Sequence, residues 1–279
     1  MLSRIADSLF WMSRYLERTE TLLRLVRTQY ILSFDADADD KGPGWPDFVE
    51  TFTSKPTHDT SDPALVLDLF ISNIKNINSV KVIVTKAREN ARGVQDNITK
   101  EVWENINQLY LLVQDPNLSK NLGSSLTLDT LEKLVGSLVL NYGVIENTMP
   151  RGLGWSFMNL GKYIERTTLT IQILRLFFEK QAREQELATD FLYWRKLLLS
   201  LSGYEMYLRN FTGTQYLKNI VDHTICNSHF PRSLNYSIER AKRSLDQIVL
   251  ETPVAGAGSI QNQFGRLYSQ IQYLSLIHI

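Results

Sequence analysis

The chain has 279 residues, of which 43% are hydrophobic and 22% are charged, so neither a disordered nor a membrane-embedded protein is expected. Its 30 Lys and Arg residues balance 30 Asp and Glu residues, and this zero net charge argues against a nucleic-acid partner. A single cysteine, Cys226, excludes an internal disulfide framework and suits a reducing, cytoplasmic location. Asp7 interrupts the apolar core that a signal peptide needs, and no apolar run approaches the ~20 residues of a membrane helix.

The spacing of apolar residues is helical along most of the chain. From Leu2 to Tyr30 they recur at alternating intervals of three and four, which predicts a first helix of about 30 residues. The segment from Phe34 to Pro63 is rich in Asp, Gly and Pro and predicts an irregular loop. The same helical spacing predicts further helices over 64–78, 80–96, 99–114, 126–147, 151–183, 188–210, 214–228, 231–250 and 259–273. No stretch alternates as a strand does, so the predicted fold is an all-α multi-helix bundle.

Two groups of residues resemble metal or nucleophile sites but lack essential parts. The acids after Phe34 resemble the start of an EF-hand calcium loop, yet the sixth and twelfth places hold Asp40 and Pro46 instead of Gly and Glu. Cys226 has His223 and His229 three residues away on either side, but one helix positions three metal ligands poorly, and no third group orients a base. We therefore expect a half-buried cysteine and no metal.

No cofactor is expected either. The chain has no phosphate-binding G-x-x-x-x-G-K-[ST] loop, so an ATP-dependent step would belong to a partner. Trp103, Trp155 and Trp194 could stack on a ligand, but tryptophans at helical spacing beside leucines usually belong to the core.

An internal repeat relates residues 9–27 to residues 157–175. At this offset of 148 residues, five of 19 positions are identical, and four of the five form the runs Tyr-Leu-Glu-Arg-Thr and Tyr-Ile-Glu-Arg-Thr. The apolar seam of the first helix aligns with an apolar seam in the second. A third pair, Glu239-Arg240, lies 74 residues after the second, and the same step from Arg18 reaches Arg92, three residues after Glu89.

The repeated Glu-Arg dipeptide predicts contacts between helices. Adjacent residues on a helix point about 100° apart and cannot pair with each other. Arg18 also falls within a stripe of apolar residues, and a buried guanidinium needs a carboxylate or a bound anion. If the two repeated helices pack side by side, we expect Glu165 to pair with Arg18 and Glu17 with Arg166.

Several separated motifs carry a family resemblance. They are Tyr15-Leu16-Glu17-Arg18, residues 87–92 (ARENAR), residues 101–107 (EVWENIN), Arg151-Gly152 to Trp155, residues 160–166 (LGKYIER) and Phe230-Pro231-Arg232-Ser233. With these motifs the chain resembles the bacterial alpha-E domain family over nearly its whole length. The resemblance implies an all-helical fold with an ER motif, and it implies partners encoded nearby, a circularly permuted ATP-grasp protein and a transglutaminase-like protein. Such partners imply a system that forms or modifies peptides.

The charged residues of these motifs form the candidate site. They are Glu17, Arg18, Glu89, Arg92, Arg151, Glu165, Arg166, Glu239 and Arg240. One interpretation is a structural polar network that fixes the register of the helices. A second is a pocket in which arginines bind a carboxylate or phosphate, and a third is general acid–base chemistry by Glu17 or Glu165.

These observations lead to one overall hypothesis. Residues 1–273 are expected to form a single helical domain whose halves, about 1–148 and 149–273, are pseudo-repeats. Residues 274–279 match the translation of a transposon adapter used for sequencing libraries, CTGTCTCTTATACACATC, so we interpret them as an adapter-derived tail and expect a longer native protein. The expected function is a helical scaffold or ligand-holding component of the peptide system. The alternative is an enzyme of that system that uses a Glu/Arg pocket for acyl or aminoacyl transfer.

Overall fold

Helices account for all the regular secondary structure that this computed structural model describes, over residues 1–34, 41–53, 60, 62–252 and 256–273. The all-α prediction is therefore confirmed. In chain order the helices are α1 (Ser3–Leu32), α2 (Trp45–Phe52), α3 (Pro63–Ile71), α4 (Val80–Arg92), α5 (Lys100–Val113), α6 (Leu118–Leu122), α7 (Thr127–Thr148), α8 (Leu153–Arg183), α9 (Phe191–Ser200), α10 (Tyr204–Asn210), α11 (Tyr216–Val221), α12 (Leu234–Glu251) and α13 (Ala257–Gln272). Within these ranges, no helix combines the length and apolar character that crossing a membrane requires.

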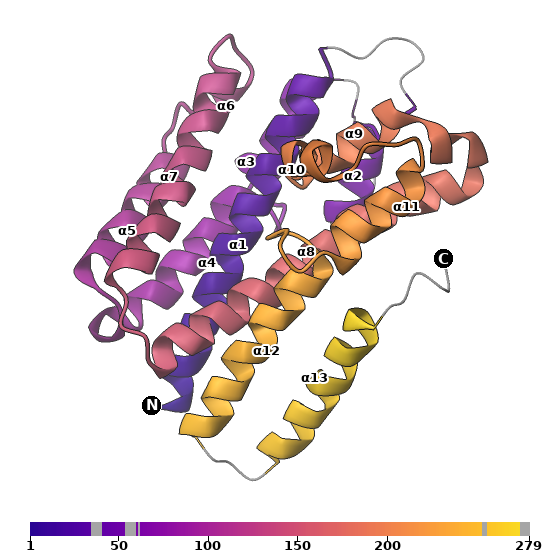
Figure 1. Cartoon of the computed structure of the whole chain (residues 1–279). Coiled ribbons are helices and arrows are strands. Elements are labelled where there is room, and N and C mark those ends of the chain that lie inside the picture. The colour runs from indigo at the N-terminus through magenta and orange to yellow at the C-terminus, as the bar shows by residue number, and fades with distance from the viewer. Residues whose placement is uncertain (35–40, 54–59, 61, 253–255, 274–279) are drawn as a thin grey trace.

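The arrangement centres on the two longest helices, α1 and α8, which pack side by side (Figure 1). On one side, α1 joins α4, α5 and α7 in a ring of four helices in which each packs against the next. On the other side, α8 packs against α12, and α12 against α13. Buried apolar residues of both α1 and α8 belong to one hydrophobic cluster, so residues of the two predicted halves share a core.

The buried faces of α1 and α8 agree only partly with the aligned apolar seams. On α1, the seam residues Leu9, Met12, Leu16, Leu23 and Val26 are all buried. On α8, the corresponding seam includes a buried leucine at position 174, but Ile171 is 47% exposed. The expectation of equivalent buried faces was therefore partly wrong. The physical reason is that α1 has neighbours on nearly all sides, whereas α8 packs mainly against α1 and α12. The superposition of the two halves stays a prediction.

One close approach sets how α1 and α8 meet. Leu9 of α1 contacts Gly154 near the start of α8, and Phe10 contacts Gly161. Further along both helices, Arg166 pairs with Glu17, so α1 and α8 run in the same direction. A Cβ atom on Gly161 would overlap the carbonyl oxygen of Phe10. Because glycine has no Cβ, the two backbones can come together at this point.

The predicted loop from Phe34 to Pro63 was wrong in its middle, where α2 forms. The backbone N–H of Gly44 donates to the Asp47 carboxylate at 2.8 Å, and Pro46 occupies the first turn. Both features are common at the N-terminal ends of helices. Four apolar side chains of α2 are buried in the core: Trp45, Phe48, Val49 and Phe52. Tertiary burial therefore stabilises a helix of eight residues that is too short to be stable alone. The acids at positions 35, 37, 39 and 40 lie outside the described residues.

Other predicted helices are shorter than expected or interrupted. The predicted helix over 188–210 is two helices, α9 and α10, because Ser202 adopts a left-handed φ of 54° and the chain turns there. The helix predicted over 214–228 becomes α11 followed by a π-helical turn, Asp222–Cys226. The helices predicted over 64–78 and 80–96 end at Ile71 and Arg92. The last predicted helix forms as α13, and the predicted adapter-derived tail, 274–279, lies outside the described residues.

The close approach at Gly161 predicts a strongly unfavourable substitution. Gly161→Ala should lower the free energy of unfolding by about 1–3 kcal/mol, because the added methyl group forces the two backbones apart. Gly143→Ala on α7 is the matched control, since a Cβ there meets nothing within 4 Å and better helix propensity should stabilise by up to ~1 kcal/mol. Urea denaturation measures both changes, and a neutral or stabilising Gly161→Ala would contradict the contact.

Candidate functional site

The two Glu-Arg motifs pair reciprocally across the contact between α1 and α8. Arg166 donates through Nε and Nη2 to both carboxylate oxygens of Glu17, at 2.6 and 2.9 Å. In the other direction, Arg18 donates to Oε1 of Glu165 at 2.5 Å, and Arg14 donates to Oε2 of the same carboxylate at 2.6 Å. Both crossed pairs that the repeat predicts are therefore confirmed.

The pairing follows from the parallel packing of the repeat. Since each motif occupies the same place on its helix and the helices run in the same direction, the two motifs lie level with each other. Both carboxylates are removed from solvent, with Glu17 0% and Glu165 1% exposed. A buried carboxylate needs charged or hydrogen-bonding partners, and the opposite helix supplies them.

Glu17 lies at the more enclosed end of this arrangement. The Tyr142 hydroxyl of α7 donates to its Oε2 at 2.8 Å, in addition to the two bonds from Arg166. Arg166 also donates to the carbonyl oxygen of Pro231 at 3.2 Å, in the segment before α12. Glu17 therefore connects α1 with α7, α8 and the start of α12.

A third buried carboxylate, Glu20, extends the arrangement by one turn of α1. It accepts hydrogen bonds from Arg24 at 2.8 and 2.5 Å and from Arg232. Arg232 also lies 4.0 Å from Glu17. Lys162 joins them through its ammonium group, which lies 4.2 Å from the centre of the Tyr142 ring. Together these residues form what we call the ER network: Arg14, Glu17, Arg18, Glu20, Arg24, Tyr142, Lys162, Glu165, Arg166 and Arg232.

Sequence reasoning missed six members of the ER network as site residues. For Arg14 and Lys162 a signal existed, because they are equivalent positions of the repeat, and each lies three residues before a motif glutamate. Arg232 was within a motif of the family resemblance. For Glu20, Arg24 and Tyr142 the sequence contained no such signal. A polar residue on a long helix does not reveal which neighbouring helix will cover it.

The charges of the ER network shift the pKa values of its members. Burial alone would raise the pKa of Glu17, but the charge and hydrogen bonds of Arg166, with help from Arg232 and Lys162, lower it to about 2. Burial lowers the pKa of Lys162 to about 8, and the positive charge of Arg166 acts in the same direction. Burial, together with the negative charge of Glu17, raises the pKa of Tyr142. Glu17 is therefore a firmly ionised carboxylate at neutral pH.

Five predicted site residues do not join the ER network. Glu89 and Arg92 are exposed and pair with each other at 2.5 Å on α4. Arg151 pairs with Glu146 at 2.9 Å and stacks on Trp155, while Glu239 pairs with Arg243 on α12. Arg240 is also exposed and lies over the ring of Tyr236, 5.0 Å from its centre. The even spacing of 74 residues in the sequence therefore does not correspond to a shared site.

Cys226, His223 and His229 differ in their surroundings. Burial raises the pKa of the Cys226 thiol, which opposes thiolate formation. His223 is buried and stacks on Phe230 with ring centres 4.5 Å apart, whereas His229 is exposed. Across the described part of the chain, no group of three or more His, Cys, Asp or Glu residues is placed to hold a metal ion.

The three tryptophans differ in their surroundings. Trp194 is 0% exposed and belongs to the core. Trp103 is half-buried with the Arg88 guanidinium 5.5 Å from its ring centre. Trp155 is half-buried too and lies beside a cleft between α8 and α12. Trp155 is therefore positioned to contact a ligand in that cleft.

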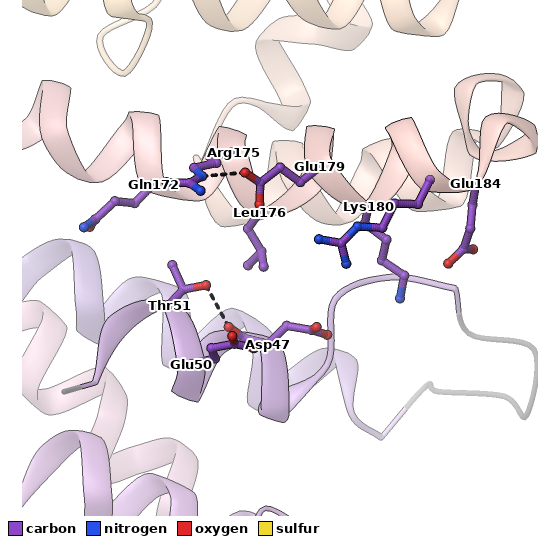
Figure 2. A pocket seen from close by; sticks show the side chains of 10 residues that line it. Asp47, Glu50, Thr51, Gln172, Arg175, Leu176, Glu179, Lys180 and Glu184 are labelled. Carbon is purple, nitrogen blue, oxygen red and sulfur yellow. Dashed lines mark hydrogen bonds and ion pairs between the residues drawn. The ribbon is translucent and has the colours of Figure 1, made fainter. Parts of the chain in front are cut away.

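Two polar clefts flank α8. The first, of about 450 Å³, lies between α2 and the C-terminal part of α8, and its lining mixes both signs of charge (Figure 2). Its Arg175 pairs with Glu179 along the helix at 2.6 Å. The second, of about 470 Å³, lies between the N-terminal part of α8 and α12 and includes Tyr163, three residues before the Arg of the second motif. The second cleft is thus the one next to the ER network.

Comparison with known proteins places the chain in a family. Residues 1–279 match the family Alpha-E, described as a predicted alpha-helical domain with a conserved ER motif, and the chain belongs to this family. Uncharacterized proteins of Mycobacterium bovis and of two strains of Mycobacterium tuberculosis are 24% identical over 270 residues. These matches cover 88% of this chain but only 30% of each relative's length. No solved structure gives a significant match.

The reciprocal pairs predict unequal costs for two arginine substitutions. Arg166→Met should destabilise by about 3–5 kcal/mol, because it leaves the buried Glu17 without its bidentate partner. Arg18→Met should cost only about 2 kcal/mol, since Arg14 still holds Glu165. Arg175→Met, which breaks an exposed pair, should cost less than ~1 kcal/mol. Urea denaturation at neutral pH gives all three values, and equal costs for Arg166→Met and Arg18→Met would contradict the asymmetry.

The low pKa of Glu17 predicts how stability depends on pH. Its pKa falls from an ordinary value of 4.5 to about 2 on folding, so the native state holds this proton more weakly than the unfolded state. The resulting stabilisation is complete above pH 4.5 and is lost as the pH falls toward 2, by about 2 kcal/mol between pH 6 and pH 3. Glu17→Gln should lose correspondingly less stability over that interval, and Glu179→Gln, at an exposed site, should behave as the wild type. Parallel stability curves for wild type and Glu17→Gln would contradict the shift.

Proposed function

We propose that this chain is a helical scaffold or ligand-holding component of a peptide-synthesis or peptide-modification system. It works beside a circularly permuted ATP-grasp protein and a transglutaminase-like protein, the partners that the family resemblance implies. Its ligand is a peptide or another molecule that carries a carboxylate. An ATP-dependent partner also favours the cytoplasm as the location.

The burial of both motif glutamates is the observation that carries the scaffold role. Glu17 and Glu165 are at most 1% exposed, and each is held by the arginine of the opposite motif. Side chains used in this way fix two long helices in one register. The network therefore supports a structural role in which α1 and α8 are held in one arrangement, as a scaffold requires.

The alternative, an enzyme that uses the Glu/Arg residues for acyl or aminoacyl transfer, receives less support. A general acid or base works best with a pKa near the working pH, and the pKa of Glu17 is about 2. Such a group also has to reach the substrate, whereas the two motif carboxylates are enclosed by arginines and by Tyr142. These facts favour a structural role for the motif.

The lengths of the relatives support a role as one component of a larger system, rather than a role as an enzyme that acts alone. The matched region makes up only 30% of each mycobacterial protein, so in those proteins the corresponding segment shares its chain with a larger remainder. A rigid helical domain that presents surfaces to other parts of a system fits this organisation.

Co-purification tests the proposal. The tagged full chain is produced together with the ATP-grasp and transglutaminase-like proteins encoded beside its gene, and the purified material is examined by size-exclusion chromatography and mass spectrometry. We expect a complex with at least one of them, with a Kd of about 1 μM or tighter. Failure of both proteins to co-elute with the chain would contradict the proposal.

A matched pair of variants separates the scaffold from the enzyme. Glu165→Gln changes a buried motif carboxylate, and Glu179→Gln changes an exposed one on the same helix. For a scaffold, peptide product formed per assembled complex should stay within about twofold for both variants. A loss above about 100-fold for Glu165→Gln alone, with the complex intact by chromatography, would favour the enzyme instead.

A further inference from the structure

The cleft between α8 and α12 has the size of a small-ligand site and combines polar with aromatic side chains. Its volume of about 470 Å³ falls within the ~300–1,000 Å³ usual for ligand pockets. Three aromatic residues line it, Trp155 and Tyr163 from α8 and Tyr236 from α12. The rings of Tyr163 and Tyr236 meet edge to face, with centres 6.2 Å apart. The cleft also borders the ER network, because the Arg166 guanidinium lies 5.4 Å from the centre of the Tyr163 ring.

Three strong hydrogen-bond donors line this cleft without protein acceptors. Arg240 lies over the Tyr236 ring and forms no ion pair with a carboxylate of the described residues. In the same part of the chain, the hydroxyl groups of Tyr163 and Tyr236 make no hydrogen bond. One guanidinium and two phenols on neighbouring turns of two helices are donors suited to a carboxylate.

The other polar side chains of the cleft already have partners. Asn159 donates to the carbonyl oxygen of Trp155 at 3.0 Å, and Ser244 donates to that of Arg240 at 3.0 Å. The amide of Gln247 donates to a glutamate on the next turn at 2.5 Å. The donors left for a ligand are therefore Arg240 and the two tyrosine hydroxyls, together with the indole N–H of Trp155, which also lines the cleft.

The balance of charge in the cleft indicates a single negative charge on the ligand. Glu146 is neutralised by Arg151 at 2.9 Å, and Arg243 is neutralised by Glu239. Arg240 then contributes one uncompensated positive charge. One positive charge matches a carboxylate, whereas a phosphate dianion requires about two.

We propose that this cleft binds the C-terminal carboxylate of a short peptide, through Arg240 and the hydroxyl groups of Tyr163 and Tyr236. The aromatic rings contact the apolar part of the last residues, because the cleft is larger than a carboxylate alone would fill. This site rests on the proposed function and names the ligand that the domain holds. It also gives Arg240 a role outside the ER network.

Direct binding to the purified full chain tests this site. The probes are the tripeptide N-acetyl-Ala-Ala-Phe with a free carboxylate and the same peptide as its C-terminal amide, measured by isothermal titration calorimetry. We expect the acid to bind about tenfold or more tighter than the amide. Arg240→Gln should weaken binding of the acid about tenfold and leave binding of the amide unchanged, and Tyr236→Phe should weaken the acid about threefold.

Arg175→Gln is the matched control for Arg240→Gln. Both substitutions remove an exposed arginine beside a cleft on α8, but Arg175 lies in the cleft of Figure 2 and has Glu179 as its partner. The control should change peptide affinity less than twofold, and unchanged thermal unfolding would show that both variants are folded.

Two results would overturn the proposed site. One is equal affinity for the acid and the amide, or an absence of binding by either at millimolar concentration. The other is inorganic phosphate displacing the peptide at equal concentration, which would make the cleft a general anion site. The outcome is separate from that of co-purification. Peptide binding without a complex would contradict only the proposed function, and a complex without peptide binding would contradict only the cleft.

Discussion

The burial of Glu17 and Glu165 between two parallel helices is the constraint on which the rest of this structure depends. A carboxylate removed from water is strongly unfavourable unless cations and donors surround it. Here the arginine of each motif serves the glutamate of the other, so neither helix can shift along its partner without leaving a buried charge unpaired. The glycine contact with Phe10 then lets the backbones come close enough for these short bonds.

The ER network is not symmetrical, although the repeat that builds it is. Around Glu17 the neighbours are a bidentate arginine and the Tyr142 hydroxyl, and the glutamate is 0% exposed. Around Glu165 the neighbours are Arg14 and Arg18, which keep 19% and 25% of their side chains exposed. At the Glu17 end, α7 contributes the Tyr142 hydroxyl and Arg166 is only 10% exposed, so the arginines at the Glu165 end are the more accessible ones. The most enclosed part of the ER network therefore lies where α1, α7, α8 and the start of α12 meet.

Sequence and structure agree where a local pattern decides the outcome. Apolar spacing located the long helices, and the repeated dipeptide located the crossed pairs, because both depend on the period of a helix. The short elements were missed for the opposite reason. The helix from Trp45 to Phe52 depends on burial against residues distant in the sequence, and the turn at Ser202 separates two helices within one apolar pattern. Arg92 and Arg240 shared a spacing with the motif arginines, yet spacing alone does not decide which helix face a neighbour covers.

The sequence by itself determined the all-helical class, the position of α1 and α8, and the pairing of the two Glu-Arg motifs, since a repeated polar dipeptide on a buried helix has few other partners. Only the tertiary structure decided that Glu20, Tyr142 and Arg232 join those motifs and that Glu89, Arg92, Arg151, Glu239 and Arg240 do not. The physical reason is that hydrophobic spacing fixes which face of a helix is buried. Which side chain pairs with a buried charge depends on how helices that are distant in the sequence cross each other. That crossing geometry depends on the packing of the whole core.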